Sequence, residues 1–114
     1  MSDRNETLLL EDIIDAIDKI FLYTEGMSFE QYSSNELVQD AVERNFEIVG
    51  EAASRIGDDF RQKFSSIDFR LLKDFRNVII HRYFDVRQEI LRNAKEYELA
   101  DLKQKIQNVL QQLL

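Results

Sequence analysis

The chain has 114 residues, and 44% of them are hydrophobic, which is enough for the core of one domain. Pro and Cys are absent and Gly occurs three times, so little interrupts long helices, and disulfides and thiolate metal sites are excluded. The formal net charge of −7 argues against a broad nucleic-acid-binding surface but leaves room for a small basic cleft.

No apolar run approaches the length of a membrane span, and the N-terminus lacks the pattern of a signal peptide. We therefore expect a cytoplasmic protein with no membrane contact. A single domain is expected over residues 1–114, because no repeat, linker or low-complexity segment divides the chain. No cofactor or metal ion is expected.

Two amphipathic helices are predicted in the first half of the chain. Apolar residues recur at spacings of three and four over residues 6–25, and Gly26 is a suitable stop. After a short connector, the same spacing returns over residues 36–56, with Ser34 or Asn35 as the N-cap. The first helix has more apolar residues than one stripe needs, which indicates contact with more than one neighbour.

Two residues within the second predicted helix stand out. Gly50 lies between Val49 and Ala52, and this smooth patch should let another helix approach closely. Asn45 falls near the apolar stripe, where a hydrogen-bonded buried amide is a better interpretation than a catalytic group.

The second half of the chain predicts further helices. Residues 58–66 suit a short helix or turn, and Asp68 is a suitable N-cap for a helix that ends near Asp85. Helical spacing continues from Val86, with a break near Tyr97. The predicted fold is all-α, an antiparallel bundle of four to five helices, and surplus apolar surface on the first and third helices indicates a homodimer.

The only histidine of the chain, His81, lies in a short apolar segment that also contains Arg76, Asn77 and Tyr83. On an ideal helix Arg76 and Tyr83 lie on nearly the same line, whereas Arg76 and His81 differ by about 140°. Arg76 and His81 therefore cannot both reach one small atom from a straight helix. Either the helix deforms at His81, or a second copy of the helix completes the site across a two-fold axis.

This segment resembles the R-N-x-x-x-H-x-Y signature of HepT-like proteins, which are small helical ribonuclease toxins of the HEPN superfamily. The matching string is Arg76-Asn77-Val78-Ile79-Ile80-His81-Arg82-Tyr83. A second string resembles the family's R-N-h-E-h-h-G-E-A segment, where h is apolar: Arg44-Asn45-Phe46-Glu47-Ile48-Val49-Gly50-Glu51-Ala52. Two motifs in the right order make the resemblance specific.

The resemblance implies a HEPN-type domain that dimerises and cleaves RNA without a metal ion in a cleft at the dimer axis. Arg76, His81 and Asn77 are then the catalytic residues. The resemblance also implies a toxin–antitoxin system in which an MNT-type nucleotidyltransferase antitoxin transfers AMP to Tyr83.

The residue types suit this chemistry, because RNA carries its own nucleophile, the 2′-hydroxyl. Imidazole, with a reference pKa of about 6.5, can accept that proton or, once protonated, donate one to the leaving oxygen. The planar guanidinium of Arg76 can bind the phosphate as its charge grows. Two alternatives remain open: a non-catalytic helical subunit that binds nucleotide and partners a nucleotidyltransferase, and a dimeric structural bundle in which Arg76 and His81 serve packing.

Overall fold

The computed structural model of the chain describes residues 3–81 and 83–114. These residues form helices and no strand, which confirms the predicted all-α fold. The helices are α1 (Asp3–Thr24), α2 (Phe29–Ser33), α3 (Glu36–Arg55), α4 (Asp58–Lys63), α5 (Phe69–His81), α6 (Phe84–Tyr97) and α7 (Leu99–Gln112). None of the described helices combines the length and the apolar character needed to cross a bilayer.

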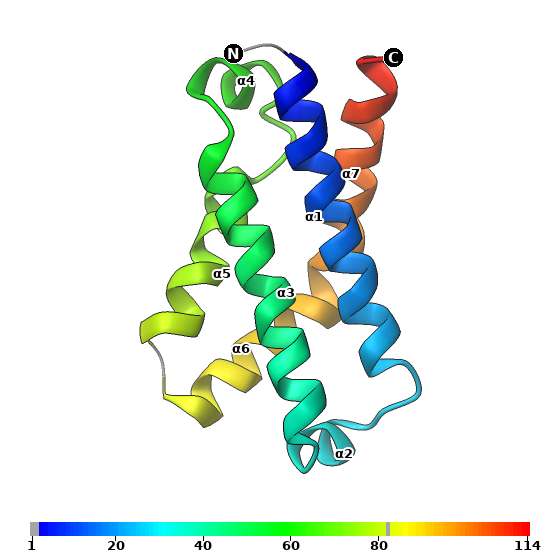
Figure 1. Ribbon diagram of the computed structural model, residues 1–114, viewed down its shortest axis with the longest axis vertical. Coiled ribbons are helices and arrows are strands. Elements are labelled where there is room, and N and C mark those ends of the chain that lie inside the picture. Colours follow the sequence, from blue (N-terminus) through cyan, green and yellow to red (C-terminus); the bar gives the residue numbers. More distant parts are fainter. Residues whose placement is uncertain (1–2, 82) are drawn as a thin grey trace.

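The longer helices form an antiparallel bundle, as predicted (Figure 1). Helix α3 lies between α1 and α5 and contacts both. Helix α7 runs beside α1 in the opposite direction, and α6 crosses behind α3, while the short helices α2 and α4 lie at the two ends of the bundle (Figure 1). The predicted break near Tyr97 is confirmed, since it separates α6 from α7.

The core is formed by the apolar face of each long helix. Its fully buried side chains include Leu10, Ile13, Ile17 and Ile20 of α1, Phe46 and Val49 of α3, Leu72 of α5, Leu91 of α6, and Leu99 and Ile106 of α7. Removing each such side chain from water stabilises the fold by about 1.5–3 kcal/mol. The core therefore fixes α5, which carries the candidate catalytic residues, against α3.

Local signals at the helix ends agree with the sequence predictions. Asn35 Oδ1 accepts the backbone N–H of Val38 at 3.1 Å, and Asp68 Oδ1 accepts that of Leu71 at 3.0 Å. Each cap satisfies a backbone donor that has no partner inside the helix. Gly26 has φ +72°, the left-handed conformation that ends α1.

The prediction that the third long helix extends to Asp85 is wrong, because α5 ends at His81 and α6 begins three residues later. Phe75 and Leu91 are both 2% exposed, so both belong to the core. They are sixteen residues apart, and a straight helix would place them about 160° apart around its axis. A break between α5 and α6 lets both side chains face the same core.

Candidate active site

Gly50 brings α3 and α5 into close contact beside Arg76. A Cβ atom on Gly50 would lie 2.8 Å from Arg76 Cβ, 3.0 Å from Arg76 N and 3.3 Å from the carbonyl oxygen of Leu72. The rings of Phe46 and Phe75 pack edge to face between the same helices, with centroids 5.1 Å apart. The close approach predicted at Gly50 is confirmed, and it fixes the position of Arg76 on the surface of α3.

The other polar residues of the second motif are satisfied within α3. Arg44 forms ion pairs with Glu47 at 3.0 Å and Glu51 at 3.8 Å. Asn45 is 6% exposed, and its Nδ2 donates to the carbonyl oxygen of Ala41 at 2.8 Å. The interpretation of Asn45 as a satisfied buried amide is therefore confirmed, and this motif supports the helix that positions Arg76.

Arg76 and Asn77 are exposed and line an open groove of about 570 Å³ between α3, α4 and α5. Its charged lining consists of four cations and one carboxylate: Arg61, Arg70, Lys73, Arg76 and Asp74. The surface between α3 and α5 is thus both hollow and basic, in a chain whose net charge is −7. Such a groove is suited to a polyanion.

His81 is the last residue of α5, and its side chain lies outside the described part of the structure, as does all of Arg82. The backbone is helical through His81, so the helix does not deform between Arg76 and His81. The angle of about 140° between these two positions therefore applies. Of the two alternatives considered from the sequence, the completion of the site by a second copy of the helix stays a prediction, and so does a deformation at His81, where α5 ends.

Tyr83 does not continue the line of Arg76 on one helix, and that prediction is wrong. It precedes α6 as its N-cap, with extended backbone angles of φ −62° and ψ 149°. Its carbonyl oxygen accepts the N–H of Arg87 at 2.8 Å, and Arg87 is bound to Glu43 of α3. The backbone of Tyr83 is thus tied to the bundle, whereas its side chain is 89% exposed.

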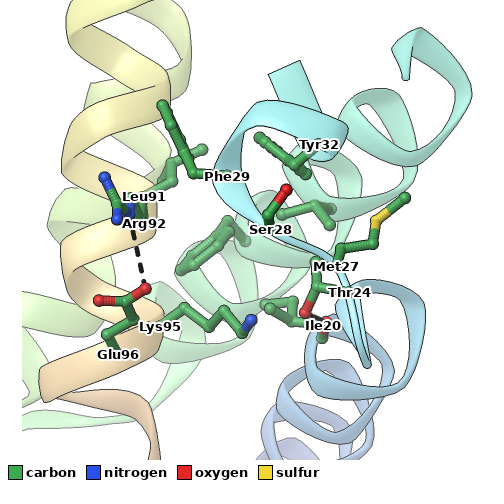
Figure 2. Close-up of a pocket in the computed structure, with 12 residues that line it drawn as sticks. Ile20, Thr24, Met27, Ser28, Phe29, Tyr32, Leu91, Arg92, Lys95 and Glu96 are labelled. Atoms are coloured by element: carbon green, nitrogen blue, oxygen red, sulfur yellow. Dashed lines mark hydrogen bonds and ion pairs between the residues drawn. The ribbon is translucent and has the colours of Figure 1, made fainter. Parts of the chain in front are cut away.

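A second hollow lies at the other end of the bundle, between α1, α2 and α6 (Figure 2). It measures about 50 Å³, far below the roughly 300–1,000 Å³ of small-molecule sites. Arg92 lies over the ring of Phe29, 4.5 Å from its centroid, and pairs with Glu96 at the rim (Figure 2). A nucleotide does not fit there.

A buried polar cluster lies near this hollow. The hydroxyl of Tyr32 donates to Gln88 Oε1, and its carbonyl oxygen accepts from Gln39 Nε2 at 2.8 Å. Burial, and secondarily the nearby Glu43 carboxylate, raises the pKa of Tyr32. Tyr32 is therefore a neutral structural tyrosine. Among the described side chains, which do not include those of Asp3 and His81, no three Asp or Glu carboxylates gather as a metal site requires.

The sequence interpretation missed the cations that share the groove with Arg76, namely Arg61, Arg70 and Lys73. A signal for two of them was present, because Arg70, Lys73 and Asn77 are spaced at three and four residues and share one helical face. Arg61 reaches the groove only through the packing of α4, which local spacing does not reveal.

Comparison with known proteins gives consistent matches. The sequence model of the family Ribonuclease HepT-like matches residues 13–109, a range that contains both motifs. A protein of Thermococcus cleftensis named probable ribonuclease HepT is 34% identical over 100 residues, which cover 88% of this chain and 91% of that protein. Two predicted RNases of Methanocaldococcus jannaschii are 31% and 30% identical over 113 residues, covering 99% of this chain and 97% and 93% of theirs. No solved structure matches the chain.

Proposed function

Since the chain belongs to the family of HepT-like ribonucleases, we propose that it cleaves RNA without a metal ion, as the toxin of a HEPN/MNT-type toxin–antitoxin system. The observation that carries the proposal is the placement of Arg76 and Asn77. Both are exposed in a basic groove, on a helix that ends at His81. The proposed substrate is RNA, and the proposed catalytic residues are Arg76, His81 and Asn77.

Each proposed residue has a distinct chemical role. The imidazole of His81 accepts the proton of the RNA 2′-hydroxyl, and the imidazolium of a second His81 protonates the leaving 5′-oxygen. Arg76 donates two parallel hydrogen bonds to the phosphate, whose negative charge grows in the transition state. Asn77 donates to a phosphate oxygen or orients the imidazole. The product is a 2′,3′-cyclic phosphate.

Substitution of Arg76 tests this assignment directly. Arg76→Ala should remove RNA cleavage and toxicity in cells while the melting temperature stays close to that of the wild type, because the guanidinium is exposed. The control is Lys19→Ala, which removes an exposed cation on α1. Full cleavage by Arg76→Ala would reject the proposed site.

The proposal includes a homodimer, because positions 76 and 81 differ by about 140° around one helix. Large apolar side chains around the α5–α6 turn are exposed: Ile80 at 58% and Val86 at 47%. A self-complementary contact here would bring two copies of α5 together. Surplus apolar surface of this kind is typical of a permanent interface.

Sedimentation at micromolar concentration should show one species of twice the chain mass. Ile80→Glu should shift it toward the monomer and reduce RNA cleavage, since a carboxylate would be buried in the interface. Leu22→Glu is the matched control, because Leu22 is 64% exposed on α1 at another part of the surface. A wild-type monomer that cleaves RNA would contradict the shared cleft.

We further propose that an MNT-type nucleotidyltransferase antitoxin inactivates the protein by transferring AMP to Tyr83. The side chain is exposed, and the adduct would add a bulky anion that repels RNA phosphates. Incubation with the nucleotidyltransferase encoded beside the toxin, ATP and Mg²⁺ should give an adduct on Tyr83 and loss of cleavage. Tyr83→Phe should stay active, while the control Tyr97→Phe, at a site 77% exposed, should still be inactivated. An adduct on Tyr97 instead would refute the assignment.

The second candidate function is a non-catalytic subunit that binds nucleotide and partners a nucleotidyltransferase. The basic groove is compatible with this function, because its cations would also bind the phosphates of a nucleotide. The RNA-cleavage assay separates the two functions, because a binding subunit would retain RNA or nucleotide without cleaving RNA.

A further inference from the structure

Among the described residues, the cations of α5 form no ion pair with a carboxylate. Among the described residues, the ion pairs involve these cations: Arg44, Arg61, Arg87, Arg92, Lys103 and Lys105. Arg70, Lys73 and Arg76 are in none of them, although the chain has 22 acidic residues. All three line the same groove, where Asp74 is the one carboxylate among the lining residues.

These cations are arranged along the axis of α5. Arg70, Lys73 and Asn77 are spaced at three and four residues, so they occupy one face, and position 81 follows one turn later on that face. The rise from Arg70 to Arg76 is about 9 Å. The groove thus extends well beyond the one phosphate that Arg76 can bind.

We infer that this groove is a track for the RNA backbone, in which Arg70 and Lys73 bind phosphates next to the one that is cleaved. The inference rests on the proposed ribonuclease function and adds the path of the substrate to it. Arg70 and Lys73 are positioning residues, because they contact phosphates that do not react. Arg61 contributes less, since its Nε donates to the carbonyl oxygen of Ile56 at 2.9 Å and its Nη2 lies 3.4 Å from Asp58.

The composition of the groove indicates that it binds backbone and does not read sequence. Exposed aromatic faces are a common platform for the bases of a single strand. Phe69, the aromatic residue in the lining, is 5% exposed and belongs to the core. The lining therefore offers charge for phosphates and no exposed aromatic ring, and phosphate contacts set the register of a strand without specifying bases.

The negative net charge of the chain restricts where RNA can bind. A surface that is acidic elsewhere repels RNA, so attraction is confined to the basic groove and guides the strand to Arg76. This reconciles a charge of −7 with a polyanionic substrate.

The experiment compares Arg70→Gln/Lys73→Gln with Lys19→Gln/Lys105→Gln, a control that also removes two positive charges, on α1 and α7. Binding is measured with a 2′-O-methyl RNA of about twenty nucleotides, which lacks the nucleophile, so binding is measured independently of cleavage. Loss of two phosphate contacts should make the slope of log K, where K is the association constant, against log salt about 1.4 less steep. The advantage of the wild type in affinity should then be about 25-fold larger at 0.1 M salt than at 1 M salt. The control should keep the wild-type slope.

Cleavage gives the second readout. A dinucleotide carries only the phosphate that is cleaved, so at about 0.1 M salt kcat/KM of the groove variant for long RNA should fall about 25-fold relative to its kcat/KM for the dinucleotide. The inference would be overturned if the wild type cleaves RNA but the groove variant equals the control in the salt slope and in the ratio of kcat/KM for long RNA to kcat/KM for the dinucleotide. The proposed function would then still stand. Absence of wild-type cleavage together with a reduced slope would reject the proposed function and retain the groove as an RNA-binding site.

Discussion

Replacement of Gly50 by Ala tests whether the contact between α3 and α5 fixes the site. The new methyl group would lie 2.8 Å from Arg76 Cβ, and ordinary contact begins at 3.4 Å, so α5 must move by at least 0.6 Å. The neighbouring atoms are Arg76 Cβ, the backbone nitrogen of Arg76 and the carbonyl oxygen of Leu72, and none of them can rotate away. The strain must therefore be relieved by a shift of the whole helix.

Two free-energy terms oppose each other in this variant. Ala stabilises a helix interior by about 1 kcal/mol relative to Gly. Overpacking costs about 1–3 kcal/mol, and a contact with backbone atoms lies toward the upper end of that range. We expect Gly50→Ala to lower the free energy of unfolding by about 1–2 kcal/mol. The displaced Arg76 should also reduce RNA cleavage on the order of tenfold, because positioning errors below 1 Å already affect catalysis.

Urea unfolding and a cleavage assay on the same preparation measure both effects. The control is Ser54→Ala, one turn further along α3, where the side chain is exposed and the substitution should be neutral or slightly stabilising. If Gly50→Ala were as stable as Ser54→Ala and cleaved RNA at the wild-type rate, α5 would be free to move, and the reasoning from Gly50 would be refuted.

The remaining predictions concern the buried tyrosine and a helix cap. Burial raises the folded-state pKa of Tyr32 above its usual value of about 10, so the free energy of unfolding should fall as pH rises above about 10. Urea unfolding from about pH 8 to 11 should show a shallower fall in Tyr32→Phe than in the wild type, and equal slopes would contradict this. Asn35→Ala should lower the free energy of unfolding by about 1 kcal/mol, whereas the exposed mid-helix change Asn93→Ala should not lower it; equal effects would exclude a capping role.

Local patterns predicted much of the fold. Spacings of three and four identified the long helices, Asn35 and Asp68 marked helix starts through their side-chain oxygens, and Gly26 marked a helix end. The lack of a side chain at Gly50 predicted a close contact between helices, and the structure places this contact at Arg76. Each of these signals is a pattern within a few residues of the chain, although the partner of Gly50 lies on another helix.

The end of α5 could not be read in the same way. No Pro or Gly separates His81 from the next helix, and the break follows from the need to bury both Phe75 and Leu91 in one core. The position of Tyr83 depends on that break, so the prediction that Tyr83 lies on the line of Arg76 along one helix was wrong. The side chain of Tyr83 is exposed, so its modification stays a proposal. The basic groove could not be predicted without the fold either, because α4 contributes one of its walls.

RNA cleavage by the wild type and by His81→Ala in excess EDTA tests the central claim most directly, with the ends of the products identified by mass spectrometry. The wild type should cleave without a divalent ion and leave a 2′,3′-cyclic phosphate, because the 2′-hydroxyl is the nucleophile. His81→Ala should lose at least about 10²-fold in rate, the usual contribution of a general acid–base group. A strict requirement for a divalent ion, or full activity in His81→Ala, would contradict the account.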